Sequence, residues 1–163
     1  MNAVAGTPDV FALIKAWEGE LDVLRDAHGL AARFYEKLHW RLGLPTVIVT
    51  AILGAFVWTE SNPWTRMVDS NLVAGLLSIV VLVLNAAQTF LKTDERSNRH
   101  KNAHDRYDGL QRELQRVVAA RPSQEELSAF TADLQARWSK ISIEAPILGD
   151  ALFNKVAGLK TRP

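Results

Sequence analysis

The chain has 163 residues, a net charge of +1 and no cysteine, which suits one compact unit or a membrane anchor with a small soluble part. A nearly neutral chain is not expected to bind nucleic acid by neutralising phosphates. The lack of cysteine excludes disulfides, thiolate metal sites and cysteine nucleophiles, and it fits a reducing compartment. The first ten residues hold neither a basic residue nor an apolar core, so we expect no cleaved signal peptide.

Residues 8–42 are predicted to form a long amphipathic helix. Thr7 can cap it, Pro8 suits its first turn, and Asp9 suits the positive end of the helix dipole. Apolar side chains then recur three and four positions apart, as in a helix that packs on another helix: Ile14, Trp17, Leu21, Leu24, His28, Ala31, Tyr35 and Leu38. We expect His28 to pack within this seam rather than to bind a ligand.

Residues 44–60 are predicted to form a first transmembrane helix, because the chain from Leu44 to Thr59 carries no charge. Pro45 is expected to end the preceding helix and to start this one. Trp40 and Trp58 lie at its two ends, as tryptophans do at membrane interfaces. Small residues recur every four positions, which lets helix backbones approach closely in lipid: Thr46, Thr50 and Gly54, and also Ala51 and Ala55.

Residues 71–92 are predicted to form a second transmembrane helix. The 21 residues from Asn71 to Leu91 carry no charge, and a helix of that length covers roughly 30 Å, the thickness of a bilayer core. Residues 61–70 then become a short external loop that holds only Arg66 as a basic residue. At the other end of the hairpin, before the first span and after the second, the basic residues are Arg33, Lys37, Arg41, Lys92, Arg96, Arg99 and Lys101. The positive-inside rule therefore predicts that both termini are cytoplasmic.

Polar and basic residues recur every seven positions along the second span and beyond it, at Asn71, Ser78, Asn85, Lys92 and Arg99. This repeat predicts one continuous helical rod through Lys92. Two interpretations of the polar residues stay open. Asn85 or Gln88 could bond to Thr46 or Thr50 of the same hairpin, although only Gln88 and Thr89 match the depth of these threonines. Alternatively, an oligomer could line a narrow aqueous path or an interface with Ser78, Asn85, Gln88 and Lys92.

A second candidate site is the basic cluster that follows the second span. It is expected to contact anionic lipid headgroups or to bind an anionic ligand through Arg96, Arg99, His100 and Lys101. His100 and His104 are four residues apart but lack the adjacent glutamate of a zinc peptidase, and no third ligand is evident, so we expect no metal. We find no phosphate-binding glycine loop and no nucleophile elbow. We therefore expect no enzyme activity, no catalytic residue and no cofactor.

Residues 93–163 are predicted to form cytoplasmic helices. An antiparallel partner for the N-terminal seam is expected from heptad spacing at Ala103, Tyr107, Leu110, Leu114 and Val117. Ser123 and Glu126 form a capping box that opens a further helix, with an apolar side at Leu127, Phe130, Leu134 and Trp138. After Pro146, a short amphipathic helix is expected from Ile147, Leu148, Leu152, Phe153, Val156 and Leu159. The expected fold is an all-α membrane protein, a two-helix transmembrane hairpin extended by cytoplasmic helices that form a small helical bundle.

This layout resembles that of SLATT domains, the two-transmembrane effectors of bacterial nucleotide-signalling conflict systems. The resemblance covers nearly the whole chain, residues 1–163 as one unit, and rests on YEKLHWRLGLP at 35–45, LNAAQTFL at 84–91, HKNAHDRYDGL at 100–110 and Glu144-Ala145-Pro146. It implies an effector of antiviral defence that oligomerises and forms a pore or disrupts the bacterial inner membrane, causing death or arrest of the infected cell (abortive infection). It also implies control by a nucleotide signal, such as a cyclic nucleotide made by a partner enzyme, and no catalytic residues.

A function of a different class is also open: a non-conducting membrane anchor or adaptor whose cytoplasmic helices recruit a partner protein. For the effector we expect the lipid bilayer and further copies of the chain as partners. No nucleic acid is expected as a partner in either case.

Overall fold

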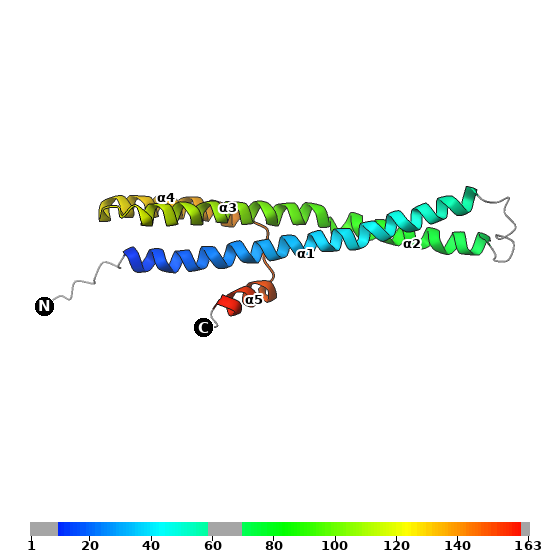
Figure 1. Ribbon diagram of the computed structural model, residues 1–163, viewed down its shortest axis with the longest axis horizontal. Helices are drawn as coiled ribbons and strands as arrows, with labels where there is room; N and C mark the ends of the chain where they lie inside the picture. The colour runs from blue at the N-terminus through cyan, green and yellow to red at the C-terminus, as the bar shows by residue number, and fades with distance from the viewer. Residues whose placement is uncertain (1–9, 59–69, 161–163) are drawn as a thin grey trace. The chain divides into compact units, whose positions relative to one another are not determined.

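The computed structural model describes residues 10–58 and 70–160, with side chains from 10 to 55 and from 72 to 160. These residues form five helices and no strand (Figure 1), which confirms the expected all-helical class for the described part. The helices are α1 (Val10–Trp58), α2 (Ser70–Leu91), α3 (Thr93–Ala119), α4 (Gln124–Glu144) and α5 (Asp150–Lys160). Several predictions fall outside the described residues: the helix start at 7–9, the end of the first span at 59–60, the loop at 61–69, and the side chains of Trp58 and Asn71.

The helix α1 is longer than the sequence predicts. We expected Pro45 to separate two helices, whereas α1 is one helix of 49 residues with Pro45 inside it. Pro45 has no N–H to donate to the carbonyl of Arg41, one turn earlier. Neighbouring hydroxyl groups and helices make such a proline tolerable in an apolar helix, and the Thr46 hydroxyl donates to the Leu42 carbonyl at 2.7 Å. The predicted break at Pro45 is therefore wrong.

The chain divides into two compact units. Unit 1 comprises Met1–Arg33 and Ser97–Pro163, and unit 2 comprises Phe34–Arg96. The helices α1 and α3 therefore each supply one part to unit 1 and one part to unit 2. Unit 1 is a helical bundle and unit 2 is a helical hairpin.

Unit 1 is a bundle in which α3 packs against both α1 and α4 (Figure 1). Its buried core combines the two predicted seams with α4: Ile14, Leu21, Ala103, Tyr107, Leu110, Leu114, Leu127, Leu134 and Ile141. Glu18 accepts a hydrogen bond from Gln115, and the Ala32 carbonyl accepts one from Ser97. The region of α1 near Glu18 thus lies beside the C-terminal part of α3, and the region near Ala32 lies beside the N-terminal part of α3. This arrangement confirms the predicted antiparallel pair.

The ends of α4 explain how the chain leaves and re-enters the bundle. Ser123 and Glu126 form the predicted capping box, since the Ser123 hydroxyl accepts from the Glu126 N–H and the Glu126 carboxylate accepts from the Ser123 N–H. After Ala145 the chain is not helical until Asp150. Ile147 and Leu148 lie in this non-helical segment, and Ile147 is 96% exposed, so their predicted place in the amphipathic helix is wrong. In α5 itself, Val156 is buried and Leu159 is exposed.

Unit 2 is an apolar hairpin made by the second part of α1 and by α2. Two described helices are long and apolar enough to span a membrane. Within their most apolar windows, only 6% and 0% of the residues are buried inside the protein. A core helix of a soluble protein would be mostly buried, whereas here large apolar side chains such as Val47, Leu82 and Phe90 are exposed. This outward apolar surface is what a lipid-facing hairpin presents.

The boundary between α2 and α3 is a single residue. Lys92 adopts a φ of 43°, a left-handed conformation that is uncommon for a residue other than glycine. Its N–H still donates to the Gln88 carbonyl at 3.1 Å, and its carbonyl accepts from the Arg96 N–H at 3.0 Å. The predicted single rod through Lys92 is therefore wrong, because an interrupted helix does not keep one seven-residue stripe.

Candidate functional site

The amide of Gln88 is used inside the hairpin. Its Nε2 donates to the Thr46 hydroxyl at 2.8 Å and lies 3.4 Å from the Leu42 carbonyl oxygen. Thr46 is buried and Gln88 is half-buried. Of the two alternatives for this residue, the structure has the intrachain bond. That Gln88 also lines a pore or faces another copy stays a prediction, since its side chain is only half-buried on the face of α2 that packs on α1.

Ser78 and Asn85 lie on a different, exposed part of α2. They are seven residues apart and so share one helix face. The Ser78 hydroxyl is satisfied within its own helix, since it donates to the Ala74 carbonyl at 2.8 Å. Among the described residues no group bonds to the Asn85 side-chain amide, while the Asn85 carbonyl accepts from Thr89. Asn85 is thus an exposed polar side chain on this face of α2, and its amide has no hydrogen-bond partner among the described residues.

Lys92, the fourth predicted pore or interface residue, lies at the helix junction. Its ammonium is 3.6 Å from the Glu95 carboxylate, and its side chain is exposed. In the same unit, the guanidinium of Arg96 lies 5.8 Å from the centre of the Tyr35 ring, a distance typical of a cation–π contact. Both cations are therefore held at the end of unit 2 where α2 ends.

The other three residues of the predicted basic cluster belong to unit 1 and do not share one environment. Lys101 is exposed. Arg99 lines a small pocket of about 180 Å³ together with Asn102, Ala103, Arg106, Ile141, Glu144 and Ala145. His100 is only 5% exposed, so its prediction as a headgroup or anion contact is wrong. It occupies an inward position of α3, where the heptad of apolar residues continues towards the start of the helix.

His100 instead meets His28 inside unit 1. Their Nδ1 atoms are 3.0 Å apart, and the His28 ring stacks on Tyr107 with 5.5 Å between ring centres. One Nδ1–H can lie between the two nitrogens when the rings carry opposite tautomers. Burial, and then the charges of His100 and His104, lower the pKa of His28 to about 4, and burial also lowers the pKa of His100. The prediction that His28 is a packing histidine is confirmed.

A metal site is not formed by these histidines. His104 points to the Arg25 carbonyl, with its Nδ1 at 2.8 Å, so it does not join His28 and His100 through that nitrogen. Within the described residues, no group of three or more His, Asp or Glu side chains could hold a metal ion.

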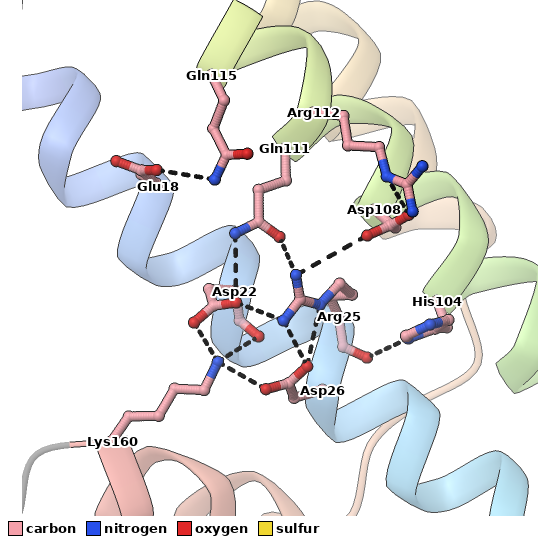
Figure 2. Close-up of polar contacts among 10 residues, drawn as sticks. All are labelled: Glu18, Asp22, Arg25, Asp26, His104, Asp108, Gln111, Arg112, Gln115 and Lys160. Atoms are coloured by element: carbon pink, nitrogen blue, oxygen red, sulfur yellow. Dashed lines mark hydrogen bonds and ion pairs between the residues drawn. The ribbon is translucent and has the colours of Figure 1, made fainter.

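Arg25 is the centre of a polar network that the sequence analysis did not identify (Figure 2). Its guanidinium lies 2.6 Å from Asp22 and 2.8 Å from Asp26, and it donates to the Gln111 side chain at 2.6 Å. Gln111 is buried and in turn donates to Asp22 at 3.2 Å. Arg25 and Asp26 follow Asp22 by three and four residues, which places all three on one side of α1. This spacing is the sequence feature from which the cluster could have been predicted.

The network also holds the last helix. Lys160 of α5 reaches both Asp22 and Asp26 on α1 (Figure 2). Partial burial acts to raise the pKa of Asp22, but hydrogen bonds from Lys160 and Gln111 and the charges of Lys160 and Arg25 outweigh it, so its pKa is lowered. The pKa of Asp26 is lowered in the same way against partial burial, by bonds from Lys160 and Arg25. Three helices therefore meet at two carboxylates.

Comparison with protein-family models, with curated proteins and with solved structures finds no match for this chain. The functional argument therefore rests on the residues and on the contacts described above.

Proposed function

We propose that this chain is a SLATT-like membrane effector of bacterial antiviral defence. Unit 2 inserts into the inner membrane with both termini in the cytoplasm, copies of the chain assemble through the Ser78 and Asn85 face of α2, and the assembly forms a pore or disrupts the bilayer. The outcome is death or growth arrest of the infected cell. A nucleotide signal from a partner system controls the activity of this effector.

The exposed apolar surface of unit 2 supports membrane insertion. Large side chains point outward along both helices of the hairpin, and Phe90 is 83% exposed. Leaving such a surface in water is unfavourable by roughly 25 cal/mol per Å². A lipid environment removes this penalty, and helical hydrogen bonds satisfy most of the polar backbone, with the Arg41 carbonyl opposite Pro45 as the exception.

The single observation that carries the assembly is the exposed amide of Asn85. In lipid, a side-chain amide without a partner is unfavourable, and a second amide or hydroxyl from a neighbouring helix satisfies it. Such interhelical bonds average only about 0.6 kcal/mol, so one bond per copy favours an assembly that can form and rearrange. Because Gln88 is already bonded to Thr46, Asn85 is, among the described side chains of α2, the amide that another copy can reach.

The test is dye leakage from liposomes that contain the purified full chain, measured with and without cyclic nucleotides. Asn85→Leu should abolish leakage and reduce the cross-linked oligomer, and Asn85→Gln should restore both because it keeps the amide. Gln88→Leu is the matched control, since it removes a second amide of α2, one that already has a partner within the chain. Leakage that is unchanged in Asn85→Leu would overturn the proposed assembly.

The orientation has its own test, because the natural chain has no cysteine. A single cysteine at the exposed position Ser139 of α4 should be alkylated in opened cells but protected from an impermeant reagent in intact spheroplasts. Labelling in intact spheroplasts would place unit 1 on the outer side and contradict the cytoplasmic termini.

The second candidate function is the non-conducting anchor or adaptor. It is favoured by the exposed isoleucines at the end of α4 and in the segment after it, Ile143 and Ile147, which offer a partner protein an apolar contact. This alternative predicts no leakage under any condition, and it predicts that cytoplasmic helices fused to an unrelated anchor keep their activity.

A further inference from the structure

The helix α5 has fewer fully buried side chains than α4. Val156, at 5% exposure, is its one buried side chain among the described residues, whereas α4 buries Leu127, Thr131, Leu134 and Ile141. Leu159, one residue from the end of α5, is exposed. A helix of 11 residues is not stable in isolation, so its structure depends on its contacts with the rest of unit 1.

The segment that joins α4 to α5 does little to hold α5 in its position on the bundle. Residues 146–149 are not helical, and Ile147 is almost fully exposed. The carbonyl of Gly149 accepts bonds from the N–H groups of Leu152 and Phe153, so this turn belongs to α5. The helix and its first turn can therefore move together on the connecting segment.

The strongest polar attachment of α5 is its Lys160. The ammonium donates to the Asp22 carbonyl at 3.0 Å and binds the carboxylates of Asp22 and Asp26. These side chains are all 28% to 38% exposed, so the attraction is screened by salt.

The network on α1 remains satisfied when Lys160 leaves. Both carboxylates also bind Arg25, at 2.6 Å for Asp22 and 2.8 Å for Asp26, and Gln111 donates to Asp22. Detachment therefore leaves no buried charge without a partner, which is the usual reason that breaking an ion pair strongly destabilises a fold.

We propose that α5 is a salt-sensitive latch: it leaves α1 as a unit while α1, α3 and α4 stay packed, and it thereby uncovers Asp22 and Asp26. This local opening does not require unfolding of the bundle core. It is a property of unit 1 and is independent of the membrane function proposed above.

The test uses the full chain, in which an introduced cysteine is the only thiol. Val156→Cys reports detachment of α5 through its rate of alkylation, and Leu134→Cys, at a fully buried position of α4, reports opening of the core. We expect Val156→Cys to react at least about tenfold faster than Leu134→Cys, yet slower than a cysteine at the exposed position 139. Adding Lys160→Met should speed the Val156→Cys reaction by about three- to tenfold and leave Leu134→Cys unchanged.

Lys155→Met is the matched control, because Lys155 lies on the exposed side of the same helix and has the same charge. It should change neither rate. Salt should speed alkylation of Val156→Cys when Lys160 is present and have little effect in Lys160→Met. Hydrogen exchange on the cysteine-free chain gives an independent measurement, in which α5 amides should exchange faster than those of α4. Equal rates at positions 156 and 134, or equal exchange in α4 and α5, would overturn the latch.

Discussion

The Nδ1 atoms of His28 and His100 lie 3.0 Å apart within unit 1, where both side chains are buried. The two residues come from α1 and α3 and are 72 positions apart in the chain. A single proton can lie between the two nitrogens, but two charged imidazoliums at this distance would repel strongly. The contact therefore requires at least one neutral ring, and this makes unit 1 sensitive to acid.

We predict that unit 1 loses stability between about pH 6.5 and pH 4. Burial and the neighbouring histidines lower the pKa of His28 to about 4, so the unfolded chain, with a pKa near 6.5 for this group, binds the proton first. The stabilisation is complete above the unfolded pKa and is lost as the pH falls, by up to about 3 kcal/mol for His28. The measurement is the free energy of unfolding from urea titrations of the full chain in detergent micelles at a series of pH values.

His28→Phe separates this effect from that of the carboxylates. The ring can still stack on Tyr107, but it no longer titrates, so the slope of stability against pH should become shallower between pH 6.5 and 4. The pKa values of Asp22 and Asp26 are lowered, so their stabilisation is present above the unfolded pKa near 4 and is lost at more acid pH. A slope that does not change in His28→Phe would show that other groups bind the protons.

The capping box of α4 gives a stability prediction with a clear sign. Ser123→Ala removes the hydroxyl that accepts from the Glu126 N–H at 3.3 Å, and this should destabilise unit 1 by about 1 kcal/mol. Ser139→Ala removes the same group from an exposed position inside α4, where alanine is the better helix former. Thermal unfolding followed by circular dichroism should therefore show a lower midpoint for the first variant and an equal or higher one for the second.

Local spacing in the sequence predicted much of the fold. The seams that contain Leu21 and Leu114 were found because helix packing repeats every three to four residues, and both leucines lie in the core. The pairing of Arg25 with Gln111 was not predicted, because these residues are 86 positions apart. Their contact depends on the register of α1 against α3, and a repeat within one helix does not define that register.

The errors at Pro45, Lys92 and His100 have different physical causes. Proline usually ends a helix because it lacks an N–H, but within an apolar hairpin the helix continues. The seven-residue repeat through Lys92 assumes unbroken helix geometry, which its φ of 43° interrupts. His100 was grouped with its basic neighbours by charge, whereas its position on α3 directs it inward to His28. For Gln88, the sequence left two partners open, and the structure has the intrachain bond to Thr46.

The continuity of α1 through Pro45 predicts the effect of removing the proline. Pro45→Ala supplies an N–H for the Arg41 carbonyl at an exposed position, so we expect stabilisation by about 1 to 3 kcal/mol. The helix content should stay the same or rise slightly. Both are measured by circular dichroism and thermal unfolding of the full chain in detergent micelles, with Val47→Ala as a control at a neighbouring exposed position. A fall in stability would indicate that the chain requires the bend or break expected at Pro45.

The bond between Gln88 and Thr46 can be measured by a double-mutant cycle. Gln88→Leu and Thr46→Val each remove one partner of the 2.8 Å bond, and the double variant removes both. Because interhelical bonds in membranes average about 0.6 kcal/mol and reach about 1.7 kcal/mol, we expect a coupling energy of about 0.5 to 1.5 kcal/mol. The readout is the free energy of unfolding of the hairpin in mixed detergent micelles. The pair Asn85→Leu and Thr46→Val should give no coupling, since Asn85 lies on the exposed face. Coupling of Thr46 to Asn85 instead of Gln88 would mean that α2 is rotated from the position described here, and it would remove the basis for an assembly through Asn85.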